Sequence, residues 1–154
     1  MKNITKLACI LGVLSAAGAA GAVSNAMTIS GASFDDQFTG ANCISRQNNG
    51  ISNACSSDSN FIYGIPKGLS SAGYSVTYTG RHNTSGLFSS IALFSHSSSG
   101  NQLAFVQSSA SNTGNWSTTI PLNSTQAPAS SRLTTYVGLP ANFQGSFFGL
   151  SLAY

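Results

Sequence analysis

Charged side chains are scarce in this chain of 154 residues. Glutamate is absent, aspartate occurs three times, and Lys and Arg together occur six times, so the formal net charge is only +3. Nucleic-acid binding normally needs a clustered basic face, and attachment to an anionic membrane needs a polybasic stretch. The sequence contains neither feature, and it therefore predicts no nucleic-acid partner and no membrane anchor.

Catalytic motifs are equally scarce. A glycosidase needs two carboxylates across the scissile bond, but Asp35 and Asp36 are adjacent and point in different directions if the chain is extended. A serine hydrolase would need His82 or His96 within about 3.2 Å of a serine hydroxyl, with an aspartate nearby. Both histidines lie in predicted turns or strand ends, where exposed histidines are common. We predict a protein that is not an enzyme, with a low-charge secreted hydrolase as the alternative.

Ligands for metals and cofactors are too few or too scattered. Zinc takes four Cys, His or carboxylate ligands, and the two histidines have no paired spacing. The stretch Asp58–Asn60 begins like a calcium loop, but no acidic ligands, glycine and closing glutamate follow at the required positions. Asp35 and Asp36 could join it only if the fold brought them together. Phosphate-binding and dinucleotide-binding motifs are also missing, so we predict no metal and no cofactor.

The amino terminus has the form of a secretory leader. Lys2 and Lys6 precede a short apolar run over residues 7–17, and small residues follow with acceptable cleavage points after Ala22 or Ala26. This order of charge, apolar segment and small residues is typical of a signal peptide. The apolar run is well short of the roughly 20 residues that a membrane-spanning helix needs. The sequence predicts export to the periplasm or to the medium.

Removal of a leader spanning residues 1–26 leaves residues 27–154 as a single domain, long enough to form a hydrophobic core. Four basic residues and three aspartates give this domain a net charge of +1. Its polar character comes instead from Ser, Thr, Asn and Gln. A surface of neutral hydrogen-bonding groups is compatible with binding to neutral glycans and with self-association.

Two cysteines remain in the predicted domain. In an exported protein such a pair favours a disulfide, and Cys43 and Cys55 would enclose eleven residues. Closing a loop of that size stabilises the folded state by roughly 3 kcal/mol. A redox site would need a Cys-x-x-Cys pair, which is missing. The enclosed segment, ISRQNNGISNA over residues 44–54, is polar with a glycine and is predicted to be a surface loop.

The remaining sequence predicts β-strands. In residues 74–79, Tyr74, Val76 and Tyr78 alternate with Ser and Thr, which is the period of a half-buried strand, whereas residues 87–95 are apolar on both faces, as in a central strand. Gly-, Pro-, Asn- and Ser-rich turns separate the runs, and no helical pattern occurs. We predict an all-β antiparallel β-sandwich or jelly roll of about eight short strands, with a barrel as the alternative. The predicted strands span residues 27–34, 60–65, 74–79, 87–95, 101–107, 115–122, 132–139 and 147–154.

One functional interpretation is binding to an extracellular glycan or cell-surface polymer. Sugar rings dock on aromatic faces, and neutral amides and hydroxyls supply the hydrogen bonds. The candidate residues are Trp116, Tyr63 and the predicted turn Arg81, His82 and Asn83. The alternative for Trp116 is a place in the core, because it shares one side of its strand with two aliphatic residues.

A second interpretation is a self-assembling surface or matrix subunit. The last predicted strand, residues 147–154, places Phe148, Leu150, Leu152 and Tyr154 on one face and ends at the last residue. If this strand lay at a sheet edge, no tail would shield it, and exposed edges pair readily with other chains. The alternative is an ordinary closed sandwich in which this strand is internal.

Overall fold

The computed structural model describes residues 26–36, 43–47, 50–65 and 73–154. The predicted leader, apart from Ala26, lies outside these residues. The described residues are almost entirely β-structure, and the only helical segment among them is a single 3-10 turn, η1 (Gly31–Ser33). Among the described residues, no helix is long and apolar enough to cross a membrane.

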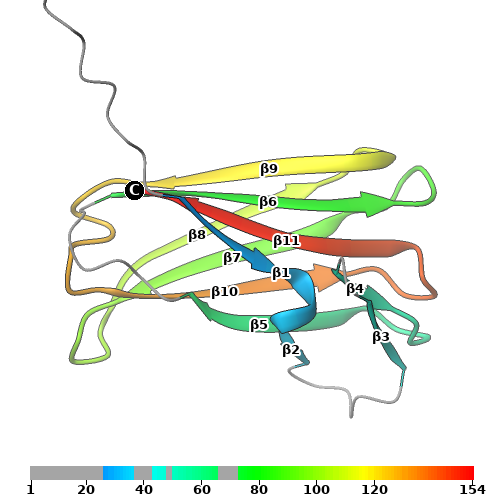
Figure 1. The fold of residues 1–154 in the computed structure, drawn as a ribbon, viewed down its shortest axis with the longest axis horizontal. Coiled ribbons are helices and arrows are strands. Elements are labelled where there is room, and N and C mark those ends of the chain that lie inside the picture. The colour runs from blue at the N-terminus through cyan, green and yellow to red at the C-terminus, as the bar shows by residue number, and fades with distance from the viewer. Residues whose placement is uncertain (1–25, 37–42, 48–49, 66–72) are drawn as a thin grey trace, which may run out of the picture.

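The strands form two antiparallel sheets. Sheet A has the order β3-β4-β11-β6-β9, with β1 also paired to β11, and sheet B has the order β2-β5-β10-β7-β8. The long strands run lengthwise in Figure 1, so the loops gather at the two ends of the molecule. The prediction of an all-β sandwich is confirmed. The strands are β1 (Ala26–Ser30), β2 (Asp35–Asp36), β3 (Ile44–Gln47), β4 (Gly50–Asn53), β5 (Ser59–Ile65), β6 (Tyr74–His82), β7 (Ser89–His96), β8 (Gln102–Ala110), β9 (Gly114–Leu122), β10 (Arg132–Leu139) and β11 (Gly145–Ala153).

The inward side chains of the two sheets form one core. In β6 the alternation read from the sequence holds, since Tyr74, Val76 and Tyr78 are all buried. Opposite them, Leu133 and Val137 of β10 are buried from sheet B. The side chains between the buried ones lie on the outer face of each sheet, because successive side chains of a strand point to opposite faces.

The segment between the cysteines is a β-hairpin, so its prediction as a surface loop was wrong. β3 and β4 pair antiparallel, and β4 also pairs with β11, where Ile51 lies opposite Phe147. Ile51 is buried in the core. The sequence between the cysteines did not indicate this, because burial of Ile51 depends on β11, which lies about a hundred residues further along.

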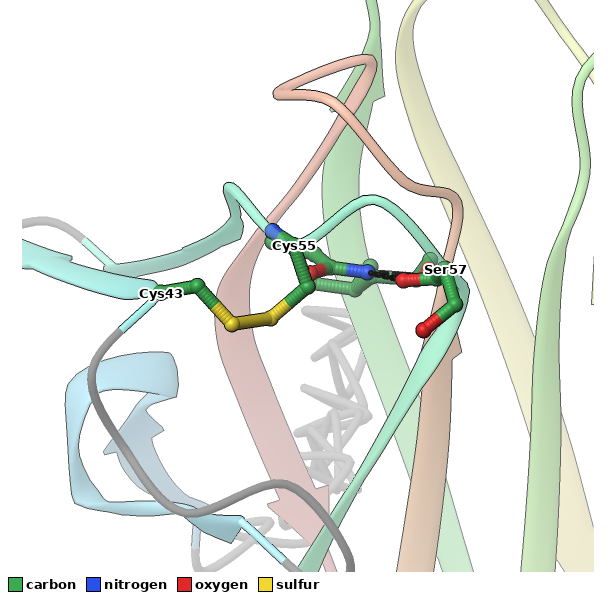
Figure 2. Close-up of a disulfide and its surroundings, with 5 residues drawn as sticks. Cys43, Cys55 and Ser57 are labelled. Atoms are coloured by element: carbon green, nitrogen blue, oxygen red, sulfur yellow. Dashed lines mark hydrogen bonds between the residues drawn. A yellow bond between two sulfur atoms is a disulfide. The ribbon is translucent and has the colours of Figure 1, made fainter.

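The predicted disulfide is confirmed and closes this hairpin at its base. Cys43 and Cys55 are bonded, and Figure 2 shows the bridge beside the turn that carries Ser57. The backbone N–H of Ala54 donates to the carbonyl oxygen of Cys43 at 2.9 Å. Asn53 Nδ2 donates to the Ser57 carbonyl oxygen at 2.9 Å, so the turn that follows the bridge is held by hydrogen bonds as well.

The carboxy-terminal strand is internal. β6 flanks β11 on one side, and β4 and β1 share its other side. The expectation that this strand could form an exposed edge is therefore wrong, and the alternative of an internal strand holds. A strand paired on both sides has no free row of backbone groups for another chain.

A β-bulge in β11 changes which side chains point inward. The register with β6 shifts between Phe147 and Gly149, so Phe147 is buried and Phe148 faces solvent. The sequence had placed Phe148 on the same face as Leu150, which is wrong for this reason: the extra residue of a bulge reverses the alternation. Gly149 has φ +146, and a Cβ there would lie 2.2 Å from the carbonyl oxygen of Ile29.

Candidate functional site

The predicted site residues do not form one site. Trp116 is only 4% exposed and lies in the core, so the alternative given for it is the one observed, and its ring offers no docking face. Tyr63 is half-buried in β5, with its ring stacked on Phe34 at a centroid distance of 5.0 Å. Arg81 is exposed on the outer face of sheet A. Asn83 lies in the loop after β6, where its Nδ2 donates to the Phe143 carbonyl oxygen at 2.7 Å.

His82 is buried, which corrects its prediction as an exposed turn residue. Its Nδ1 lies 3.0 Å from the carbonyl oxygen of Asn112, and its Nε2 lies 2.8 Å from Ser89 Oγ. A carbonyl can only accept, so in the neutral ring Nδ1 carries the proton and Nε2 accepts from the serine hydroxyl.

This pair meets the distance criterion for a serine–histidine dyad without the access that catalysis requires. Ser89 is fully buried and His82 is 1% exposed, so a substrate cannot reach the hydroxyl. A backbone carbonyl occupies the position in which a hydrolase has its aspartate. The arrangement explains His82 as a satisfied core histidine.

A groove of about 580 Å³ lies on the outer face of sheet B, mainly over β7, β8 and β10. The floor of the groove is formed by a small side chain, that of Ala92 in β7. In the strand registers Ala92 lies between two larger residues, Gln107 of β8 and Tyr136 of β10. These three side chains alternate with buried or partly buried ones, and the pleat therefore directs them away from the core. The groove is a consequence of the pleat and of a small residue between two large ones.

Aromatic rings form one end of the groove. Phe94 stacks on Phe105 at a centroid distance of 4.6 Å and meets Tyr136 edge-on at 5.3 Å. His96 lies two residues further along β7, and its ring is nearly parallel to that of Phe94 at a centroid distance of 6.1 Å. Phe105 is 45% exposed, so a large part of its ring is open to solvent. Rings arranged in this way provide an apolar surface with defined faces and edges.

Small polar groups form the other end. Ser109, Ser90, Gly138 and Asn60 lie side by side on β8, β7, β10 and β5. A Cβ added to Gly138 would lie 2.2 Å from Ser90 Oγ and 2.8 Å from Asn60 Oδ1, so the glycine lets these two polar groups approach each other. With Gln107 they present hydroxyl and amide groups that both donate and accept hydrogen bonds.

The described residues that line the groove carry no charge. Aromatic faces beside neutral amides and hydroxyls suit a neutral polyhydroxylated ligand, in which C–H faces and O–H groups alternate. No group of three or more His, Cys, Asp or Glu residues that could hold a metal ion occurs in the part of the chain that the structure describes.

Sequence reasoning missed these residues. Phe94, Phe105 and Tyr136 all fall in runs that were correctly predicted as strands, and the alternation could have separated the two faces of each strand. Alternation could not show which face of the strand points away from the core, because Leu93 and Phe94, on opposite faces, are both apolar. Residues 103–106 are also apolar on both faces, so the exposure of Phe105 could not be read from its strand either.

Comparison with known proteins supports the fold. The CBM36-1 domain of a multidomain xylanase from the hindgut metagenome of Trinervitermes trinervoides matches with a TM-score of 0.54 at 13% identity, over 84% of this chain and 97% of that one. A family 35 carbohydrate binding module from Clostridium thermocellum matches at 0.52 and 9%, over 83% and 97%. The xylan-binding module CBM15 matches at 0.51 and 7%, over 84% and 96%.

No protein-family model and no curated protein matches the chain. At identities of 7–13% the structural matches establish the β-sandwich fold. Function has to be argued from the groove itself, because one fold hosts many unrelated sites.

Proposed function

We propose that this protein is a non-catalytic glycan-binding module that holds a neutral polysaccharide in the groove on the outer face of sheet B. The observation that carries the proposal is the exposed ring of Phe105 stacked on Phe94, beside uncharged polar groups. A pyranose ring placed on such a surface buries C–H groups on the aromatic faces. Its hydroxyl groups then reach the amide and hydroxyl groups of Gln107 and Ser90.

The similarity in fold to carbohydrate-binding modules, one of them described as xylan-binding, supports this proposal. The disulfide between Cys43 and Cys55 is consistent with an oxidising compartment. We therefore also propose that residues 1–26 act as a signal peptide and that the mature domain is secreted or periplasmic.

The test is calorimetric titration of the purified protein with a panel of soluble polysaccharides. The neutral members are a xylan, a mannan and a β-glucan, and polygalacturonate serves as the charged comparison. We expect binding to at least one neutral polymer and none to the charged one. Phe105→Ala should weaken that binding by about tenfold, because a docked sugar loses one aromatic face.

The matched control is Phe148→Ala. Phe148 is also an exposed phenylalanine, but it lies on the outer face of sheet A, so its removal should leave the affinity unchanged. A paired substitution of Arg81 and Asn83 to alanine tests the site expected from the sequence. If the double variant lost binding while Phe105→Ala bound fully, the site would lie at the loop after β6 and the groove would be rejected.

A further inference from the structure

The edge strands of the two sheets differ in how they are protected. β1, β2 and β3 are short, at five, two and four residues, and β2 consists of two aspartates. β9 is nine residues long, but it contains Pro121 and presents Asn115, Ser117 and Thr119 outward. Short length, charge and proline are the devices by which natural sheets keep an edge from pairing with another chain.

β8 has a β-bulge near its start, where the register with β7 shifts at Leu103, but from Ala104 to Ala110 it has none of these devices. It is nine residues long, contains neither proline nor a charged residue, and carries two exposed apolar side chains, Leu103 at 41% and Phe105 at 45% exposure. In the described part of the chain, β8 pairs with β7 alone. Its outer row of backbone N–H and C=O groups is available to a further strand.

We propose that β8 pairs antiparallel with β8 of a second copy of this chain, forming a weak two-fold dimer. A strand without charge meets no repulsion from its own copy, and an isologous pairing needs a strand compatible with itself. Centred on Val106, the pairing uses residues 104–108, which lie beyond the bulge at Leu103, and places Phe105 of one copy beside Gln107 of the other. The two Phe105 side chains are then diagonal neighbours, about 7–8 Å apart at their backbones.

This arrangement joins the two candidate grooves. A two-fold axis normal to the sheet keeps both outer faces on one side, so the stack of Phe94 on Phe105 in each copy continues into the other. The pairing of the strands does not depend on the proposed glycan binding, whereas the joined groove rests on it. One polysaccharide chain that crossed both copies would be held with increased avidity.

The dimer should be weak. A pair of edge strands buries less area than the roughly 1,200–2,000 Å² of a stable interface. The test is sedimentation velocity on the protein produced from the full chain in an oxidising compartment, over a wide concentration range without glycan. We expect a sedimentation coefficient that rises with concentration, from monomer to dimer. A monomer at every concentration overturns the proposal.

Leu103→Lys tests the location of the interface, because it adds a charge to the exposed side of β8 outside the groove. It should raise the dimer dissociation constant by about tenfold or more. Ser117→Lys places the same charge on the exposed side of β9 and should leave the dimer unchanged. Equal loss in both variants would remove the interface from β8 and overturn the proposal.

Two further measurements separate possible failures. Concentration-dependent hydrogen exchange in residues 102–110 of the unmodified protein should show added protection at high concentration, which keeps the test valid if Leu103→Lys does not fold. Unchanged exchange there, in a sample that dimerises, would overturn the proposal. Leu103→Lys should bind a short oligosaccharide as tightly as the unmodified chain, so glycan binding and dimerisation can fail independently.

Discussion

The phenol oxygen of Tyr78 lies 2.8 Å from Thr135 Oγ1 and joins the two sheets across the core. Thr135 Oγ1 also donates to the carbonyl oxygen of Ala92 at 3.0 Å. The threonine hydroxyl has one proton, which it gives to the carbonyl, so it must accept from the tyrosine. Both side chains are fully buried. Tyr78 is therefore the donor and Thr135 the acceptor, and the loss of each side chain leaves a different group without a partner.

Substitution of Tyr78 and substitution of Thr135 should lower the free energy of unfolding by different amounts. Tyr78→Phe deletes the donor and leaves the Thr135 hydroxyl bonded to Ala92, so we expect the free energy of unfolding to fall by about 1 kcal/mol. Thr135→Val leaves the buried tyrosine hydroxyl without its acceptor and should cost more, about 1–3 kcal/mol. Urea denaturation of both variants and the double variant measures this. Equal costs would contradict the assigned direction.

Stability should decline at alkaline pH through the same tyrosine. Burial raises the pKa of Tyr78 above the ordinary value of 10. The folded state therefore favours the neutral phenol. The contribution of Tyr78 to the free energy of unfolding is complete below pH 10 and is lost progressively as the pH rises above 10. The loss should reach about 1.4 kcal/mol per pH unit. Urea unfolding between about pH 8 and pH 11.5 tests this.

Tyr78→Phe is the control for the alkaline decline. The pKa of Tyr74 is also raised, first by burial and then by the neighbouring Tyr154, so a smaller slope should persist in the variant. A decline of equal steepness in Tyr78→Phe and in the unmodified chain would assign the effect to another group.

The disulfide should contribute about 3 kcal/mol to stability. Its cysteines are 12 positions apart, and on the chain-entropy model closing a loop of this size restricts the unfolded chain by that amount. Replacement of Cys43 and Cys55 by alanine should lower the free energy of unfolding accordingly, as measured by urea denaturation. Reduction of the unmodified protein is the matched comparison. A loss below about 1 kcal/mol would mean that the unfolded chain is already restricted there.

The turn between β10 and β11 carries backbone strain. Asn142 and Phe143 both have φ of 58°, in the left-handed region, where asparagine is tolerated and phenylalanine is not. The Phe143 side chain is 53% exposed, so it gains little from burial. The backbone N–H of Asn142 donates to the Cys55 carbonyl oxygen at 2.8 Å and that of Phe143 to the Asn53 carbonyl oxygen at 2.6 Å, and these bonds hold the turn in place.

Phe143→Gly should therefore raise the free energy of unfolding by about 1 kcal/mol, because glycine adopts this conformation without strain. Asn142→Gly is the control and should give a smaller gain. Thermal and urea unfolding measure both. Destabilisation by Phe143→Gly would show that the exposed ring makes contacts that outweigh the strain.

Local patterns in the sequence determined much of this fold. Each of the eight predicted strands overlaps a strand of the structure, although the first ends at Ser30 and is followed by η1. Alternation correctly placed Tyr74, Val76 and Tyr78 in the core, because the pleat directs successive side chains to opposite faces whatever the neighbours are. The cysteine pairing followed from the number of cysteines and the predicted compartment. The low charge was compatible both with a neutral glycan ligand and with self-association.

Tertiary structure decided the rest. The hairpin at β3 and β4 depends on Ile51 meeting β11, the bulge at Gly149 depends on the approach of β1, and the candidate groove depends on β7, β8 and β10 lying side by side. Each is a contact between distant segments, which no local pattern encodes. Phe94 and Trp116 illustrate the physical reason: both are aromatic residues in strands, and only the position of the opposing sheet buries one and leaves the other on the outer face.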